Sequence, residues 1–202
     1  GRVFLKHEVE TRSFNAAPWH EPWTIKNKAG KPFQVFTPYW QPCLAQGEPA
    51  ASLPVPSKLI PPRCQLTSES LESFELLPTP DWAEGLRREW QPGESGAQDR
   101  LRRFVERSTS RYDDERNRPA LEGTSRLSPH LHFGEISPRQ VWHMCHSAHH
   151  AGKDWVHWQF LTELGWREFA YHLLFHYPRT PKEALRPGFR DFPWRDDPRR
   201  LE

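Results

Sequence analysis

A run of hydroxyl and guanidinium side chains stands directly ahead of a helix-start signal in the second half of the chain. Its residues are Thr124, Ser125, Arg126, Leu127 and Ser128, followed by Pro129. Free backbone N–H groups at a helix start attract anions, and hydroxyls and guanidiniums donate hydrogen bonds to phosphate. The segment is therefore either a phosphate-binding loop or an ordinary turn with a Ser-Pro helix cap.

A second cluster lies farther along, on one expected helix. Phe160, Glu163 and Arg167 recur at spacings of three and four, with Trp166 beside them. Glu163 and Arg167 can form an ordinary i,i+4 surface ion pair. The same helical face can instead present a carboxylate, an indole and a guanidinium to a ligand. Gly165 costs about 1 kcal/mol relative to Ala in mid-helix, which indicates close approach of another backbone or a ligand.

Two further polar clusters carry weaker signals. His143, His146, His149 and His150 follow helical spacing. No second ligand cluster or carboxylate partner accompanies them, so a solvated helix edge is favoured and no metal is expected. Arginines alternate with acids over residues 99–118, a pattern more typical of a mixed-charge surface than of a nucleic-acid footprint.

The composition limits what kind of protein carries these clusters. The chain has 202 residues, a net charge of +2 and 13% aromatic residues. This length can bury a core, and the mild charge permits nucleic-acid binding without arguing for it. Cys43, Cys64 and Cys145 are odd in number and lack a CxxC spacing, as in a reduced intracellular protein. No membrane-spanning run or signal peptide is evident, so a soluble, cytoplasmic protein is expected. We expect both ends, at Gly1 and Glu202, to be cuts in a longer chain.

The first 80 residues predict strands and irregular connections. Val3–Leu5 and Phe33–Thr37 read as short strands with a turn at residues 28–31 between them. Prolines are dense from Pro38 to Pro80, and proline blocks helix interiors. An irregular connector between two domains is therefore expected there.

From Thr79 onward the signals are those of helices. Expected helix starts are Thr79-Pro80, Ser95 with Gln98, Ser128-Pro129, Ser137-Pro138 and Asp154. Expected helix ends are Gly134, Gly152 and the residues before Pro178. Apolar residues keep helical spacing within these segments, such as Leu101, Phe104 and Val105. The sequence predicts an all-helical region.

Read together, these segments resemble the DNA photolyase and cryptochrome family. The similarity rests on Glu122–Pro129, Leu131–Arg139 and Glu163–Phe169, while Gly30–Trp40 resembles the segment that leaves the family's N-terminal α/β domain. It covers essentially the whole chain, which is identified as an internal piece most like a class I cyclobutane pyrimidine dimer photolyase.

The resemblance implies a mainly α fold, the first half of the family's helical FAD-binding domain. Residues 1–40 would end an N-terminal α/β antenna-type domain, as a short strand and loop remnant. Residues 41–78 would be the Pro-rich interdomain linker. Residues 79–202 would be the N-terminal part of the FAD-binding domain, with its C-terminal half missing.

The resemblance also implies roles for individual residues. The FAD-binding positions would be Tyr112, Thr124, Ser125, Arg126, Leu127, Ser128, Phe160, Glu163 and Arg167. The DNA-binding positions would be Arg116, Glu163 and Trp166. Glu163 and Trp166 would meet a flipped dimer, and Trp194 would be the surface-end tryptophan of an electron relay, so these three are the expected catalytic residues.

The function implied is light-driven repair of cyclobutane pyrimidine dimers by electron transfer from reduced FAD, with a carbon-carbon lyase activity. A second antenna chromophore of the folate or deazaflavin type is expected in the full-length protein, which would be a monomer that binds dimer-containing DNA and no membrane. This fragment alone is expected to be inactive. The alternative is a cryptochrome photoreceptor, and Glu163 with Trp166 favours repair. A non-enzymatic helical interaction module is the third hypothesis.

Overall fold

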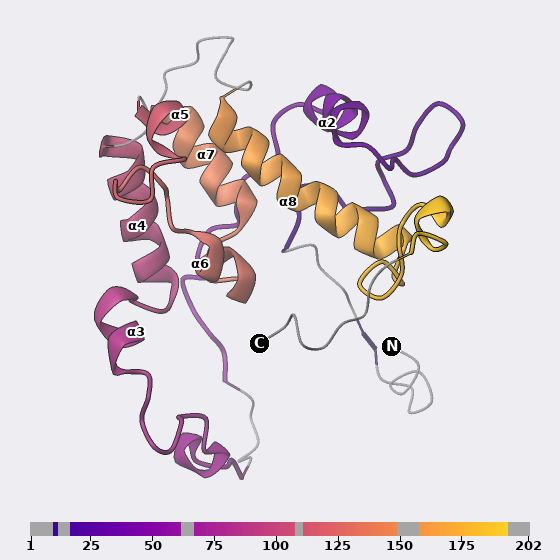
Figure 1. Ribbon diagram of the computed structural model, residues 1–202. Coiled ribbons are helices and arrows are strands. Elements are labelled where there is room, and N and C mark those ends of the chain that lie inside the picture. The colour runs from indigo at the N-terminus through magenta and orange to yellow at the C-terminus, as the bar shows by residue number, and fades with distance from the viewer. Residues whose placement is uncertain (1–9, 12–16, 62–66, 108–110, 149–157, 194–202) are drawn as a thin grey trace. The chain divides into compact units, whose positions relative to one another are not determined.

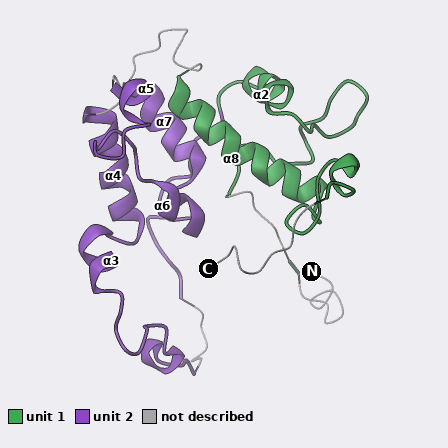
Figure 2. Cartoon of the chain, viewed as in Figure 1, with its two compact units in different colours: residues 1–48, 153–202 green, residues 49–152 purple. Residues whose placement is uncertain are grey.

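The computed structural model describes residues 10–11, 17–61, 67–107, 111–148 and 158–193 of the 202. The chain divides into two compact units (Figure 2). Unit 1 combines residues 1–48 with residues 153–202, and unit 2 is residues 49–152. Every regular element that the described residues form is an α-helix or a 3₁₀-helix (Figure 1), so the mainly α fold is confirmed.

Unit 1 is built on the packing of two helices. These are α2, Phe36–Ala45, and α8, Gln159–His176, followed by the short 3₁₀-helix η4, Pro187–Phe189. Gly165 lies where they meet, since a Cβ built on it would stand 2.9 Å from the indole of Trp40. The mid-helix glycine is thus explained by an indole rather than by the backbone or ligand that we expected. The core of unit 1 includes Ile25, Phe36, Tyr39, Trp40, Cys43, Leu161, Leu164 and Phe169.

The strand predicted for residues 33–37 is wrong, because helix α2 begins at Phe36. The buried residues Phe36, Tyr39, Trp40 and Cys43 follow a spacing of three, four and seven, which is the apolar stripe of a helix. Pro38 lies in the first turn, where no intrahelical N–H bond is required. Packing of this stripe therefore outweighs the proline signal, including Pro42 inside the helix.

The irregular connector predicted from Pro38 to Pro80 starts later than expected. Residues 49–61 and 67–70 carry no helix, and the 3₁₀-helix η1, Leu71–Phe74, follows them. The domain boundaries expected at residues 40 and 78 stay predictions. The strand expected at residues 3–5 lies outside the described residues.

Unit 2 holds the remaining helices. They are α3, Glu84–Glu89; α4, Glu94–Arg107; α5, Tyr112–Glu115; α6, Ser128–Phe133; and α7, Pro138–Ala148. Helices α4 and α7 pack on each other. Their buried residues are Gly96, Ala97, Leu101, Phe104, Pro138, Val141, Trp142 and Cys145. The predicted apolar face of α4 is therefore confirmed at Leu101 and Phe104.

Two of the predicted helix starts are misplaced. Helix α3 begins at Glu84 instead of Thr79-Pro80, because the Asp81 side chain accepts a hydrogen bond from the Ala83 N–H (3.0 Å) and forms a local turn. Helix α4 begins at Glu94, one residue before Ser95, and the Gly93 carbonyl accepts its first backbone bond. The helices exist as predicted, but local turn chemistry sets where they begin.

The helices that follow the Ser-Pro signals begin close to the predicted points. Helix α6 ends at Gly134, whose φ of 73° is the left-handed conformation that glycine adopts readily. Helix α7 starts after Ser137. The Ser137 Oγ accepts a hydrogen bond from the Gln140 N–H (3.2 Å), and the Gln140 Oε1 accepts one from the Ser137 N–H (2.8 Å). This reciprocal pair is a capping box. The predicted start at Asp154 and end near Gly152 fall outside the described residues.

The described residues also bear on membrane and disulfide chemistry. No helix among them is both long and apolar enough to cross a membrane. Cys43 and Cys145 are buried free thiols. Burial raises the pKa of each thiol to about 12. Cys64 lies outside the described residues.

Candidate functional site

The predicted phosphate-type loop is a loop in the structure and leads directly into α6. Residues 124–127 carry no helix, and α6 starts at Ser128. Arg126 has a left-handed backbone with φ of 51°, which turns the chain just before the helix. Leu127 is fully buried and anchors the loop, while Ser125 Oγ accepts a hydrogen bond from the Leu127 N–H (3.4 Å). The prediction of a loop feeding a helix near Pro129 is confirmed.

Contacts at both ends hold this loop in place. Before the loop, Gly123 packs so closely on α5 that a Cβ would stand 2.3 Å from the Glu115 Cβ. After it, buried His130 on α6 contacts Glu135 at 2.5 Å between Nδ1 and Oε2. The Gly93 backbone N–H and His130 lower the pKa of the Glu135 carboxyl, so these bonds favour its charged form. The loop is thereby fixed to α5 and to the start of α4.

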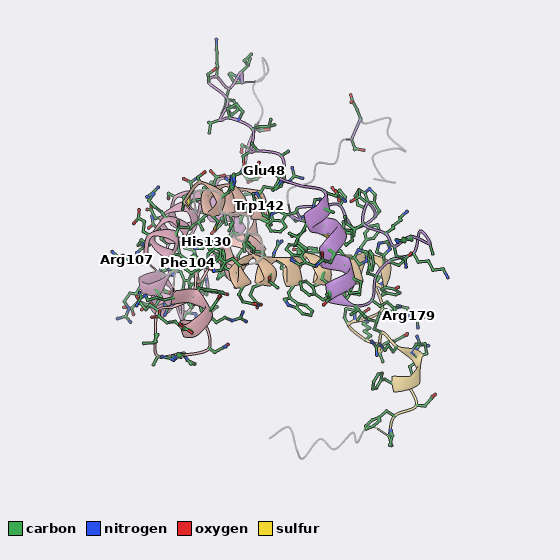
Figure 3. All side chains as sticks on the ribbon, turned by 90° about the horizontal axis from the view of Figure 1, so that it is seen from above. Glu48, Phe104, Arg107, His130, Trp142 and Arg179 are labelled. Carbon is green, nitrogen blue, oxygen red and sulfur yellow. The ribbon has the colours of Figure 1, made fainter. Side chains whose placement is uncertain are left out.

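The loop and α4 together line a cavity of about 320 Å³. The lining residues are Glu89, Arg100, Arg103, Phe104, Arg107, Arg111, Glu122, Thr124, Ser125 and Arg126. The cavity lining contains five guanidiniums and two carboxylates. Its net charge is therefore positive, and it attracts anions. Figure 3 labels Phe104 and Arg107, which both belong to α4.

The arginines of α4 were missed as site residues by the sequence interpretation. The mixed-charge description fits Arg102, which pairs with Asp99 at 2.8 Å. Arg100, Arg103 and Arg107 belong to the same mixed-charge surface and also line the cavity, which that description did not include. Their spacing of three and four along one helix face was the signal that could have found them.

Positive charge is crowded inside this cavity. The Arg100 Nη2 donates to the Glu89 carbonyl (3.0 Å), and its guanidinium lies 4.6 Å from the Trp90 ring centroid. Burial, followed by the charges of Arg103 and Arg126, lowers the pKa of Arg100. Arg126 Nη1 is 4.0 Å from Glu89 Oε2. An anion entering the cavity would relieve this repulsion.

Two further expected site residues lie next to the cavity wall. Tyr112, the first residue of α5, is buried and packs edge-on against Phe104 with 5.7 Å between ring centroids. The Arg116 guanidinium lies 5.7 Å from the centroid of the Tyr112 ring. The structure thus connects Tyr112 with the cavity through Phe104 and places Arg116 beside Tyr112.

In unit 1, α8 carries the second group of expected site residues. Phe160 is buried and contacts Trp158 with 4.9 Å between ring centroids. Glu163 is half-buried, and its Oε1 accepts from Gln159 Nε2 (2.8 Å). Trp166 remains 48% exposed and stacks on Phe36 with 3.8 Å between centroids and 12° between planes. One face of this indole is therefore backed by protein.

Arg167 has well-defined protein partners. Its Nη1 donates to the Ala17 carbonyl (2.9 Å) and to Glu168 Oε1 (3.2 Å), and its guanidinium lies 4.8 Å from the Tyr171 ring centroid. Glu168 is buried and accepts from the Trp19 N–H at 2.6 Å. Burial raises the pKa of the Glu168 carboxyl to about 7, although the Trp19 N–H and Arg167 oppose that rise. Arg167 thus helps to hold residues 17–19 on α8.

The structure brings the expected residues together in two groups. Tyr112, Arg116 and the loop residues belong to unit 2, whereas Phe160, Glu163, Trp166 and Arg167 belong to unit 1. The expectation that Phe160, Glu163 and Arg167 share a cavity with the loop stays a prediction. Trp194 lies outside the described residues.

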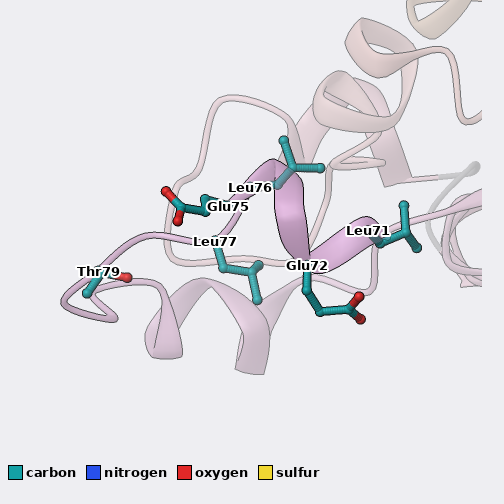
Figure 4. A pocket seen from close by; sticks show the side chains of 6 residues that line it. All are labelled: Leu71, Glu72, Glu75, Leu76, Leu77 and Thr79. Carbon is teal, nitrogen blue, oxygen red and sulfur yellow. The ribbon is translucent and has the colours of Figure 1, made fainter. Parts of the chain in front are cut away.

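The histidine cluster and a second hollow are weaker candidates for a functional site. His143 Nε2 hydrogen-bonds the Pro49 carbonyl (2.9 Å), and His149 and His150 lie outside the described residues. Within the described ranges, no group of three or more potential metal ligands occurs. A hollow of about 910 Å³ lies around η1. Figure 4 shows the side chains that line it, which are Leu71, Glu72, Glu75, Leu76, Leu77 and Thr79. These side chains are exposed.

The chain is similar to known proteins over nearly its whole length. The family described as DNA photolyase matches residues 2–58. The chain is 42% identical over 192 residues to a deoxyribodipyrimidine photo-lyase of Agrobacterium fabrum, covering 94% of this chain and 40% of that protein. It is 32% identical to Cryptochrome-1 of Arabidopsis thaliana, covering 96% of this chain and 30% of that protein.

A solved structure agrees with these sequence matches. The crystal structure of a bacterial class III photolyase from Agrobacterium tumefaciens matches with a TM-score of 0.86 and 39% identity, covering 99% of this chain and 42% of that chain. The chain therefore spans about two fifths of that structure and less than half of the two named relatives. The expected likeness to class I, as opposed to another class, stays a prediction.

Proposed function

Since this chain belongs to the DNA photolyase and cryptochrome family, we propose that it is part of an enzyme that uses light to repair cyclobutane pyrimidine dimers in DNA. The single observation that carries this proposal is Trp166, an indole that is 48% exposed and backed on one face by Phe36. Glu163 lies one helical turn before it on α8 and is half-buried. An aromatic platform beside a carboxyl suits an extruded pair of bases.

The donor set around residues 124–128 fits the phosphates of FAD. Thr124, Ser125 and Ser128 supply hydroxyls, and the arginine-lined cavity supplies positive charge. We assign FAD binding to this loop with Leu127, and to Tyr112, Phe160, Glu163 and Arg167. When bound, FAD supplies the excited electron donor for dimer splitting, and the protein supplies binding, orientation and electrostatics.

The lesion side of the site is assigned to three residues. Trp166 would stack on the extruded dimer and exclude water from one of its faces. Glu163 would accept or donate a hydrogen bond at a thymine edge, held in place by its contact with Gln159. Arg116 would contact the DNA near the lesion, and Trp194 would belong to the electron relay.

The wider properties of the enzyme follow from the same proposal. A second, light-harvesting chromophore of the folate or deazaflavin type would bind to another part of the full-length protein. The substrate is DNA that contains pyrimidine dimers, and the protein would be a cytoplasmic monomer. This chain alone, which spans about 40% of its photolyase relative, would lack activity.

A cryptochrome photoreceptor is the second candidate. It is favoured by the similarity to two Arabidopsis thaliana cryptochromes, each 32% identical to this chain. A photoreceptor uses the FAD pocket for signalling and has no need of a dimer-stacking indole. Trp166 therefore discriminates between the two functions.

The test of the proposed function is a repair assay with the purified full-length protein. A dimer-containing oligonucleotide is incubated with reduced protein in the dark and under blue light, and intact thymines are counted by chromatography. Light-dependent restoration of thymines supports repair. Flavin binding without restoration supports the photoreceptor, and the absence of flavin from the purified protein rejects both.

Retention of FAD by Arg167 variants tests one of the residues that we assign to FAD binding. Because Arg167 also pairs with buried Glu168, Arg167→Lys is compared with Arg167→Ala. We expect a lower flavin-to-protein ratio in both variants, since lysine retains the charge but not the planar fork. A full ratio in a folded Arg167→Lys protein would leave Arg167 with its structural role alone.

A further inference from the structure

We propose that Arg100, Arg103 and Arg107 of α4 bind the diphosphate of FAD together with Thr124 and Ser125, and that they make the site selective for the dinucleotide over riboflavin. This inference rests on the proposed function, because it takes FAD as the cofactor. It extends the site beyond the loop motif to a helix that the motif does not contain.

The geometry of α4 directs these three arginines to one surface. Their spacing of three and four residues places them on one face of the helix, and all three line the cavity that Thr124 and Ser125 also line. Seven residues of α-helix rise roughly 10 Å. The array therefore extends over more than one phosphate group.

The charges of the cavity call for an anion with more than one negative charge. Five arginines line it, and the carboxylates of Glu89 and Glu122 are its only acidic lining residues among those described. Arg111 forms an ion pair with Glu115 (2.9 Å), which does not line the cavity, so the charge of Arg111 is partly neutralised. Burial lowers the pKa of Arg100, and the charges of Arg103 and Arg126 lower it further. A diphosphate would balance this crowding, whereas uncharged riboflavin would not.

The donor types select phosphate among anions. Guanidiniums offer paired N–H groups that match two phosphate oxygens, and hydroxyls add single donors. Phe104 forms an apolar part of the same wall and packs on Tyr112. The cavity therefore combines polar donors with one buried aromatic side chain. This combination suits the phosphate groups of a nucleotide cofactor whose rings bind outside the cavity.

The experiment measures flavin affinity in the full-length protein. Apoprotein of the wild type and of Arg103→Gln, Arg107→Gln and the double variant is titrated with FAD and with riboflavin, following flavin fluorescence. We expect each single change to weaken FAD binding roughly fivefold and the double change roughly 25-fold, the range for partly exposed guanidinium–anion pairs that act independently. Riboflavin affinity should stay unchanged.

Arg102→Gln is the matched control. Arg102 neighbours Arg103 on the same helix, but it is 57% exposed, pairs with Asp99 and does not line the cavity. This variant should bind FAD like the wild type. Thermal unfolding of each apoprotein checks that the fold is kept.

Each outcome decides between distinct conclusions. Equal FAD affinity in the wild type and the double variant overturns the inference and leaves the proposed function intact. Equal losses for FAD and riboflavin also overturn it, because the arginines would then act on the fold. Unchanged FAD affinity with weaker, salt-sensitive DNA binding would reassign the arginines to a DNA strand. A wild-type protein that binds no flavin would reject the proposed function itself.

Discussion

Replacing Trp166 by Ala should weaken binding to dimer-containing DNA much more than binding to undamaged DNA. Trp166 is 48% exposed and stacked on Phe36. A fully covered indole buries up to about 250 Å², so roughly 100 Å² of this side chain is open to a ligand. At about 25 cal/mol per Å², covering that area contributes at most about 2.5 kcal/mol. This agrees with about 1–3 kcal/mol for one base stacked on an aromatic side chain.

The assay is a pair of titrations at one fixed salt concentration with the full-length protein. The two duplexes have the same sequence, and only one contains a dimer. We expect the dimer duplex to lose roughly five- to 150-fold in affinity, the range that corresponds to about 1–3 kcal/mol. The undamaged duplex should change little, because phosphate contacts dominate there. Trp82→Ala is the control, since Trp82 is 72% exposed in unit 2 and has no assigned role.

Two results would refute this reasoning. Equal losses on both duplexes would mean that Trp166 matters for the packing with Phe36 and thus for the fold. Full affinity for the dimer duplex would remove Trp166 from the lesion site and favour the photoreceptor function.

Three further predictions concern the packing of unit 1. Gly165→Ala should lower the free energy of unfolding by about 1–2 kcal/mol in urea titrations, because its Cβ would meet the buried Trp40 ring at 2.9 Å and this overpacking exceeds the gain in helix propensity; unchanged stability would show that Trp40 can move. The raised pKa of Glu168, about 7, means that the folded state retains a proton that the unfolded state releases near pH 4.5. Unfolding free energy should therefore fall as pH rises from about 4.5 to 7, by at most about 1.4 kcal/mol per pH unit, and Glu168→Gln should flatten this part of the stability curve; an equally steep curve in the variant would assign the dependence to other groups. Cys43, whose pKa burial raises to about 12, should resist a thiol reagent in the folded protein and react after unfolding, which mass spectrometry of labelled peptides can follow; rapid labelling of the folded protein would contradict its burial.

The sequence by itself determined helices α6 and α7 of unit 2 and the loop that leads into α6. Ser-Pro pairs and glycines act locally, through backbone capping within a few residues, so α6 and α7 could be predicted to within a residue at their starts. The family, too, was evident from short motifs in the right order. Helix caps and sequence motifs lie within short segments and do not depend on tertiary contacts.

Only the tertiary structure decided that residues 36–45 form a helix and that three arginines of α4 line the cavity of the Thr124–Arg126 loop. In the first case, packing of Phe36, Tyr39 and Trp40 outweighs the local proline signal, because burial of large aromatic side chains stabilises more than a missing N–H bond costs. In the second, spacing fixes which residues share a helix face, but it does not fix what that face meets. The partner of a face is chosen by contacts between residues distant in sequence, and no local pattern contains them.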